Sequence, residues 1–235
     1  MGKSLIQQKR GKGSSTYIAH SHRWKGTVAH KKNMGEAHGR IVDFVDCAGH
    51  SAPLAKIVYN DGEECLMVAV EGLRVGDAVS SGAVSHIPGS TMGLKDIPEG
   101  TLVCNIENQP GDGGKLVRAG GTFAKIVAKT PEGIVVRLPS KKEKTLFPEC
   151  RATIGIVAGG GRVEKPFLKA GTRFFAMKAK NKLWPQVCGV SMNAVDHPYG
   201  GTSSHHKGRP TIAPRRAGPG RKVGKIRPRR TGWKR

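Results

Sequence analysis

Aromatic residues and long apolar segments are scarce in this sequence. Phe, Trp and Tyr make up 5% of its 235 residues, and no segment approaches the roughly 18 apolar residues that a membrane-spanning helix needs. Residues 1–6 also lack the apolar stretch of a secretory signal and the Ser or Thr required for N-myristoylation. We therefore expect a protein that has no membrane association and that works in the cytoplasm.

Closely spaced cysteines are absent as well. The cysteines are odd in number and lie 18 or more residues apart, at Cys47, Cys65, Cys104, Cys150 and Cys188. This spacing excludes the paired ligands of a zinc knuckle, which lie roughly two to four residues apart. We expect buried, reduced thiols, with no structural metal and no cofactor.

Acidic residues are nearly missing from both ends of the chain. Forty Lys and Arg residues against 17 Asp and Glu give a net charge of +23. Residues 1–40 contain nine basic residues and one acid, residues 196–235 contain twelve and one, and residues 41–195 contain nineteen and fifteen. Large apolar residues are also few at both ends, so neither end can offset the entropy of ordering about 40 residues. The sequence thus predicts a globular centre with two cationic extensions.

The centre has the pattern of a mainly β protein. Short segments rich in β-branched residues alternate with turn signals, and two of the turns, Asp61-Gly62 and Glu132-Gly133, suit tight hairpins because glycine accepts a positive φ. We expect one short helix near residues 174–180. The predicted strands are residues 41–47, 56–59, 65–71, 78–81, 102–107, 123–129, 134–138, 145–147 and 152–157.

A segment rich in proline and glycine divides the centre. Residues 85–100 contain Pro88, Gly89, Gly93, Pro98 and Gly100 and have no strand pattern. We therefore predict two small β domains, residues 37–92 and 93–190, between an N-terminal extension (1–36) and a C-terminal extension (191–235). Each domain is small enough to be marginally stable alone.

The composition of the extensions indicates a nucleic-acid partner. Residues 215–230 intersperse Arg and Lys with Gly and Pro, so guanidinium groups can bind phosphate on a backbone that approaches it closely. In the N-terminal extension, Tyr17 and Trp24 can stack on bases. No helix-turn-helix, zinc-finger or basic-zipper pattern offers a helix that reads a DNA groove. Structured RNA is therefore the favoured partner.

Catalytic motifs are incomplete. The glycine-rich residues 111–115 and 159–162 match neither phosphate-binding consensus. Cys188, Asp196 and His197 suggest a nucleophile, a carboxylate and a base. Pro198, however, favours an extended backbone at His197, and neighbouring side chains on extended chain point in opposite directions. We expect no catalytic residue.

Residues 185–201 read PQVCGVSMNAVDHPYGG and resemble the signature loop of the universal second protein of the large ribosomal subunit, in its archaeal/eukaryotic form. Residues 97–107, 110–122, 150–155 and 220–224 support the resemblance in the same order. The likeness runs over essentially the whole chain. The sequence departs from the usual pattern at Cys188, where the family has arginine, and at Ser191, Ala194, Tyr199 and Thr202.

The resemblance implies an OB-like barrel followed by an SH3-like barrel, with extensions buried in ribosomal RNA. It also implies a primary rRNA-binding protein that supports subunit association, tRNA binding and the peptidyl-transferase region. Neighbouring ribosomal proteins and a contact with the small subunit are expected partners. The loop expected near the peptidyl-transferase centre, as RNA contact and not as catalyst, comprises Met192, Asn193, Asp196, His197, Pro198, Gly200 and Gly201.

The basic residues expected to bind rRNA come from both extensions and from the centre. They are Arg10, Lys12, Arg23, Lys25, Lys31, Lys32, Arg40, Lys115, Arg118, Arg151, Arg209, Arg215, Arg216, Arg221, Lys222, Lys225, Arg227, Arg229 and Arg230. Two alternative functions belong to other classes of protein. A DNA-compacting chaperone would bind duplex DNA about as well as RNA, and a hydrolase would turn over a substrate alone and depend on His197.

Overall fold

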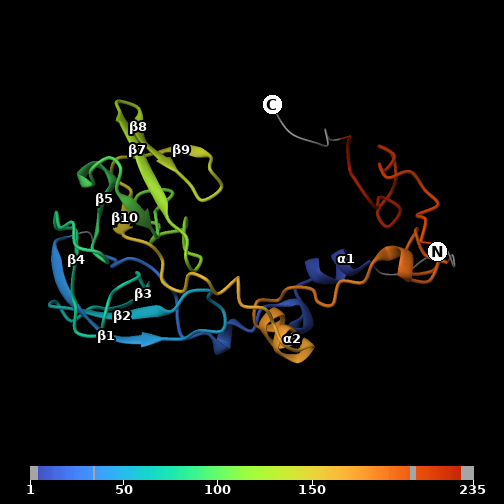
Figure 1. The fold of residues 1–235 in the computed structure, drawn as a ribbon, viewed down its shortest axis with the longest axis horizontal. Coiled ribbons are helices and arrows are strands. Elements are labelled where there is room, and N and C mark those ends of the chain that lie inside the picture. Colours follow the sequence, from blue (N-terminus) through green and yellow to red (C-terminus); the bar gives the residue numbers. More distant parts are fainter. Residues whose placement is uncertain (1–4, 34, 202–204, 229–235) are drawn as a thin grey trace. The chain divides into compact units, whose positions relative to one another are not determined.

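The computed structural model describes residues 5–33, 35–201 and 205–228 (Figure 1). The chain divides into two compact units. The first, Ser21–Ala170, contains the strands and is called the β unit here. The second combines Met1–His20 with Gly171–Arg235 and is called the basic unit. The predicted extension of residues 1–36 and the predicted domain of residues 93–190 therefore each extend across both units.

The β unit contains ten hydrogen-bonded strands in the order β3-β2-β1-β4-β5-β10-β6-β7-β8-β9. Neighbouring strands are antiparallel except β4 and β5, which are joined by the single parallel pair Ser81 and Thr91. The bounds are β1 Ala37–Val45, β2 Leu54–Tyr59, β3 Glu64–Val68, β4 Ala78–Ser81, β5 Thr91–Gly93, β6 Leu102–Cys104, β7 Ala124–Thr130, β8 Gly133–Arg137, β9 Glu143–Leu146 and β10 Arg151–Ile154.

Nine of these strands lie where the sequence predicts strands, and the mainly β interpretation is confirmed. The exception is β5, which lies inside the segment rich in proline and glycine and pairs with β10. Both predicted hairpins form, and Gly62 and Gly133 have φ values of 81° and 146°. At Gly133 a Cβ atom would lie 2.6 Å from the carbonyl oxygen of Leu146, so the turn requires glycine for space as well as for conformation.

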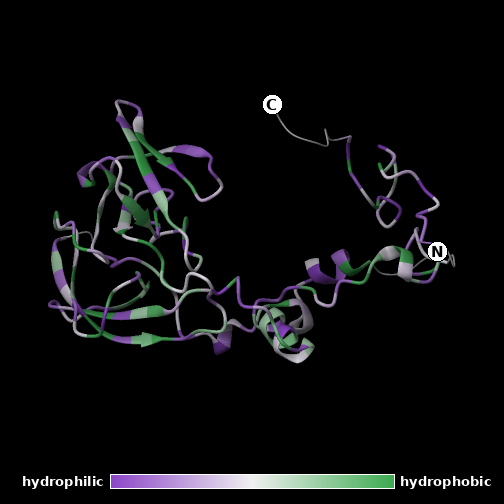
Figure 2. Ribbon diagram, in the orientation of Figure 1, coloured by the Kyte–Doolittle hydropathy of each residue, from purple (hydrophilic) through white to green (hydrophobic). Residues whose placement is uncertain are grey.

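Three apolar clusters make up the interior of the β unit. One is formed by β1–β4 and includes Ile41 and Ile57, and another is formed by β5–β10 and includes Met92 and Ile126. The third joins the two groups of strands and contains the buried side chain of Val28. Figure 2 shows hydrophobic residues recurring along these strands. The two groups of strands thus share part of their core, which compensates for the small size of each.

Residues 28–32 pass between the two groups of strands and bond to both. The N–H of Ala29 donates to the carbonyl of Leu66 at 3.1 Å, after which the N–H of His30 donates to the carbonyl of Gly113 at 3.0 Å. Leu66 belongs to β3, whereas Gly113 follows β6. This segment therefore connects the first group of strands with the second.

The helices are short. The helix expected near residues 174–180 is confirmed as α2, Ala170–Ala179, whereas α1, Ile6–Gly11, was not predicted. No described residue of either helix is buried. The 3₁₀ turns are η1 Ser15–Tyr17, η2 Ser21–Arg23, η3 Leu94–Asp96 and η4 Gly189–Ser191. Within the described part of the chain, no helix has the length and apolar character needed to cross a membrane.

Candidate nucleic-acid interface

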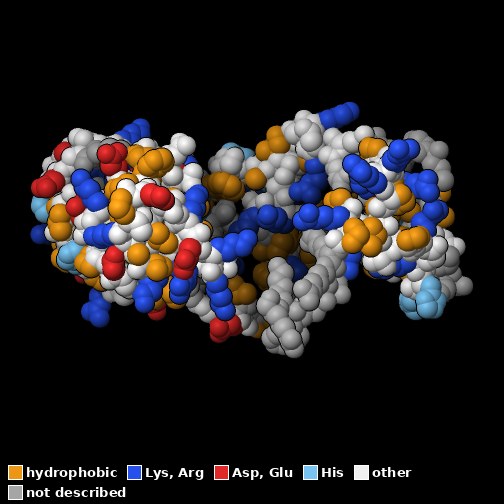
Figure 3. All heavy atoms as spheres, turned by 90° about the horizontal axis from the view of Figure 1, so that it is seen from above, with side chains coloured by type: hydrophobic (Ala, Val, Ile, Leu, Met, Phe, Trp, Pro, Cys, Tyr) orange, Lys and Arg blue, Asp and Glu red, His pale blue; other side chains and the backbone are white. Residues whose placement is uncertain are grey.

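Charge separates the two units. The sequence of the basic unit contains 20 Lys and Arg residues and one acid, Asp196, whereas that of the β unit contains 20 and 16. On the face seen in Figure 3, acidic side chains lie among the basic ones over the β unit, and basic side chains prevail over the basic unit. So large an unbalanced charge favours a polyanionic partner.

The signature loop holds His197 in a defined place. Its backbone N–H donates to the carbonyl of Asn193 at 3.1 Å and its carbonyl accepts the N–H of Gly200 at 2.9 Å, so the chain turns here instead of running extended as expected. The N–H of Tyr199 donates to Nδ1 of His197 at 3.0 Å, and the two ring centroids lie 5.0 Å apart. A Cβ atom on Gly189 would overlap the imidazole, so glycine is required there.

The chain after the loop is more ordered than its composition predicts. The N–H of Ala213 donates to the carbonyl of Lys225 at 2.8 Å, and the N–H of Lys225 donates to the carbonyl of Thr211 at 2.9 Å. Tyr199 and Ala213 are buried beside this pairing. Gly224, with φ of 89°, permits it, because a Cβ atom would lie 2.6 Å from the Tyr199 hydroxyl oxygen. Part of this end is therefore held by local backbone hydrogen bonds and by burial of Tyr199 and Ala213.

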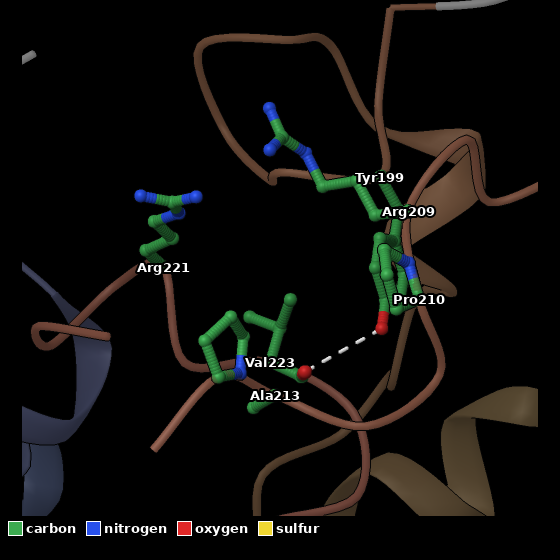
Figure 4. A pocket seen from close by; sticks show the side chains of 7 residues that line it. Tyr199, Arg209, Pro210, Ala213, Arg221 and Val223 are labelled. Carbon is green, nitrogen blue, oxygen red and sulfur yellow. Dashed lines mark hydrogen bonds between the residues drawn. The ribbon is translucent and has the colours of Figure 1, made fainter. Parts of the chain in front are cut away.

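Tyr199 also borders a small cavity of about 50 Å³ (Figure 4). Its hydroxyl donates to the carbonyl of Val223 at 3.4 Å, and Nε of Arg209 donates to the carbonyl of Pro198 at 3.1 Å. Arg209 and Arg221 both line the cavity. Two guanidinium groups thus lie beside the apolar side chains of Pro210, Ala213 and Val223. This arrangement suits a phosphate next to a ribose or base.

Most basic residues predicted to bind RNA are exposed. They are Arg10, Lys12, Arg23, Lys25, Lys32, Arg40, Lys115, Arg209, Arg215, Arg216, Arg221, Lys222, Lys225 and Arg227. Arg118 is half-buried and donates to the carbonyls of Gly114 and Val28. Arg229 and Arg230 lie outside the described residues.

Lys31 is buried and has partners within the protein. Its side chain is 1% exposed, and Nζ lies 2.5 Å from Oδ2 of Asp61 and 3.1 Å from Oε2 of Glu63. The ammonium group also lies 5.7 Å from the ring centroid of Tyr59. A lysine held this way is unavailable to an RNA phosphate unless the two ion pairs break, so it is omitted from the interface proposed below.

Arg151 is likewise paired inside the β unit. Its Nε and Nη2 donate to Oε1 of Glu107 at 3.1 and 2.8 Å, and Nη1 donates to the carbonyl of Lys31 at 2.7 Å. Glu107 is fully buried and also accepts three backbone N–H groups, from Gly111, Gly113 and Arg151. Burial opposes ionisation of Glu107, but the hydrogen bonds from Arg151 hold its pKa below the ordinary value. Arg151 too is omitted from the interface.

His30 completes this buried network. Its Nε2 lies 2.6 Å from the carbonyl oxygen of Asn105, which makes Nε2–H the donor. Burial, and next the charge of Arg151, lower the pKa of His30 to about 4. The imidazole is therefore neutral at physiological pH, and it serves the interior of the β unit rather than RNA.

The aromatic residues available for stacking differ in part from those predicted. Trp24 is half-buried and packs edge-on against His50, with centroids 5.6 Å apart. Tyr17 instead borders a large cavity in the basic unit together with Phe174 and Trp184. The sequence signal for the latter pair, aromatic residues among the lysines of residues 173–184, was present but was interpreted only as a helix.

The thiols and carboxylates of the described ranges form no group that could hold a metal ion. All five cysteines are free; Cys47, Cys104 and Cys150 are buried as expected, but Cys65 is only half-buried and Cys188 is exposed. Among residues 5–33, 35–201 and 205–228, no group of three or more His, Cys, Asp or Glu side chains has the arrangement of a metal site.

A mainly β unit joined to a nearly acid-free basic unit defines a nucleic-acid-binding protein. Residues 2–81 match the family described as Ribosomal Proteins L2, RNA binding N-terminal domain, and residues 87–217 match Ribosomal Proteins L2, C-terminal domain. The chain belongs to this family of ribosomal proteins, uL2, which is not a family of enzymes.

Archaeal relatives extend the match to both ends. The chain is 49% identical over 241 residues to large ribosomal subunit protein uL2 of Methanothermobacter thermautotrophicus, covering all of both chains. It is 52% identical over 239 residues to the uL2 protein of Methanocaldococcus jannaschii, covering 99% of each. The resemblance seen in residues 185–201 is thereby confirmed, including its archaeal/eukaryotic type.

Proposed function

We propose that this protein is an rRNA-binding structural constituent of the large ribosomal subunit and that it works on the ribosome. The observation that carries the proposal is the family match over the full chain, because it includes both the RNA-binding domain and the basic C-terminal segment. The unbalanced charge of the basic unit supports it independently.

The mechanism is electrostatic and steric. Exposed Lys and Arg side chains neutralise phosphates, and their guanidinium groups bind phosphate oxygens in pairs. If the protein contacts about 6–10 phosphates, raising the salt concentration from 50 to 200 mM lowers its affinity for RNA roughly 10³- to 10⁵-fold. In the folded subunit, surrounding RNA strengthens the attachment, because many contacts must break together.

The division of the chain into two barrels and two extensions is also part of the proposal. Residues 37–92 form an OB-like barrel and residues 93–190 an SH3-like barrel, flanked by extensions 1–36 and 191–235. Separate buried clusters in β1–β4 and in β5–β10 support two such modules. The third cluster, shared between them, favours docking of the pair on RNA as one body.

The signature loop is proposed to approach the peptidyl-transferase region and to support tRNA binding and subunit association. The close packing of His197 on Gly189 and Tyr199 supports a positional role for the histidine. Neighbouring ribosomal proteins, and a contact of residues 93–190 with the small subunit, complete the proposed partners.

Gradient fractionation of a cell lysate tests the proposal. The protein is followed by mass spectrometry at low and high salt. We expect about one copy per large subunit, retained through a high-salt wash. Migration with bulk DNA would support a chaperone instead, and free protein with hydrolytic activity that His197→Ala abolishes would support a hydrolase; either result would overturn the ribosomal assignment.

A further inference from the structure

A cavity in the basic unit has a volume of about 520 Å³. It lies between residues 10–20 and residues 174–184, which are far apart in the sequence. Asn181 joins its two sides: its side-chain amide donates to the carbonyl of Tyr17, and its own carbonyl accepts Nη2 of Arg10 at 3.4 Å. Pockets of this size accommodate small organic ligands.

Aromatic and cationic side chains both line this cavity. Tyr17, Phe174 and Trp184 provide rings, while Arg10 and Lys178 provide positive charge. Nζ of Lys178 lies 5.9 Å from the ring centroid of Phe174. No carboxylate lines the cavity. Rings beside cations are the combination by which proteins hold an unstacked base and its phosphate.

We propose that this cavity binds a single unpaired nucleotide extruded from RNA. The base stacks on Trp184 or Tyr17, the amide and backbone of Asn181 border its polar edge, and Arg10 and Lys178 bind the flanking phosphates. The assignment rests on the proposed rRNA-binding function and deepens it. An apolar peptide is a poorer occupant of the cavity, because covering the charged groups of Arg10 and Lys178 with an uncharged partner would leave both cations unpaired.

Ultraviolet crosslinking tests the site in the assembled particle. Large subunits that contain this protein are irradiated, digested and analysed by mass spectrometry. We expect nucleotide adducts on Tyr17, Phe174 or Trp184. Crosslinks confined to other parts of the chain would overturn the proposal and leave rRNA binding standing, whereas absence of the protein from the subunit would contradict the proposed function itself.

Binding by the full-length protein provides the second test. The probes are an RNA hairpin with one bulged 2-aminopurine nucleotide and the same hairpin without the bulge. We expect about 5- to 150-fold tighter binding of the bulged hairpin, the range that stacking of one base contributes, together with quenching of the 2-aminopurine fluorescence. Equal affinity for the two hairpins would overturn the site.

Variants separate stacking from general electrostatics. Trp184→Ala and Tyr17→Ala should each reduce the preference for the bulged hairpin while leaving affinity for the paired hairpin unchanged, which also verifies folding. Phe175→Ala is the matched control, because this ring lies on α2 beside the cavity-lining Phe174 and is 68% exposed but does not line the cavity. Loss of preference in the control alone would contradict an extruded RNA nucleotide as the ligand.

Discussion

Replacing Glu107 by glutamine should destabilise the β unit by about 3–5 kcal/mol. The substitution keeps the shape of the side chain but removes the negative charge that accepts two side-chain hydrogen bonds from Arg151. Glu107 is fully buried and the Arg151 side chain is 7% exposed, so water cannot replace the lost partner. Breaking one side of a buried ion pair costs about this amount because the remaining charge is left uncompensated.

Urea unfolding of the purified full-length protein, followed by far-ultraviolet circular dichroism, measures the change. Glu143→Gln is the matched control. Its ion pair with Arg137 has an N–O distance of 2.7 Å, close to the 2.8 Å between Arg151 and Glu107, but the side chains of Glu143 and Arg137 are 49% and 53% exposed. That variant should lose no more than about 1 kcal/mol. A double-mutant cycle of Glu107→Gln with Arg151→Met should give a coupling energy of about 2–3 kcal/mol. Equal losses in the two single Glu→Gln variants would refute the reasoning.

Three further changes have defined outcomes. The pKa of His30 is about 4 in the folded protein against 6.5 ordinarily, so the stability that its neutral form contributes is fully present above pH 6.5 and falls by about 3 kcal/mol as the pH drops toward 4. The urea midpoint should fall less steeply over this pH range in His30→Gln than in the unmodified protein, and identical slopes would exclude His30 as the cause of the pH dependence. Deleting residues 200–235 removes twelve Lys and Arg residues and should weaken rRNA binding and flatten its salt dependence, with an unchanged slope as the contrary result. His197→Ala should leave incorporation into the large subunit intact, as measured on gradients, and loss of incorporation would contradict its proposed role.

The sequence predicted the strands well because their pattern is local. β-branched residues and turn glycines mark nine strands, but β5 depends on pairing with β10, about 60 residues away in the chain, and its surroundings contain proline and glycine. Charge was a less reliable guide to the interface. Lys31 and Arg151 have the same composition signal as exposed residues, and only the fold brings Asp61, Glu63 and Glu107 to them.

Aromatic residues illustrate the same limit. Trp24 and Tyr17 were equally good stacking candidates in the sequence, since both lie among basic residues. In the fold, Trp24 packs into the β unit, whereas Tyr17 lines the same cavity as Trp184, a residue 167 positions further along the chain. A shared cavity over that sequence distance has no periodic signature, so it could not be inferred from spacing.

The position of residues 28–32 between both groups of strands constrains the order in which the protein is completed during synthesis. These residues leave the translating ribosome before any strand does, yet the carbonyl of Lys31 bonds to Arg151, 120 residues later. At about 5–20 residues per second, that partner emerges on the order of ten seconds afterwards. The first group of strands can pair within itself in that interval, but its N-terminal segment stays only partly bonded. The β unit therefore matures as a whole, and a nascent chain that stops before residue 151 leaves residues 28–32 without their hydrogen bond to Arg151.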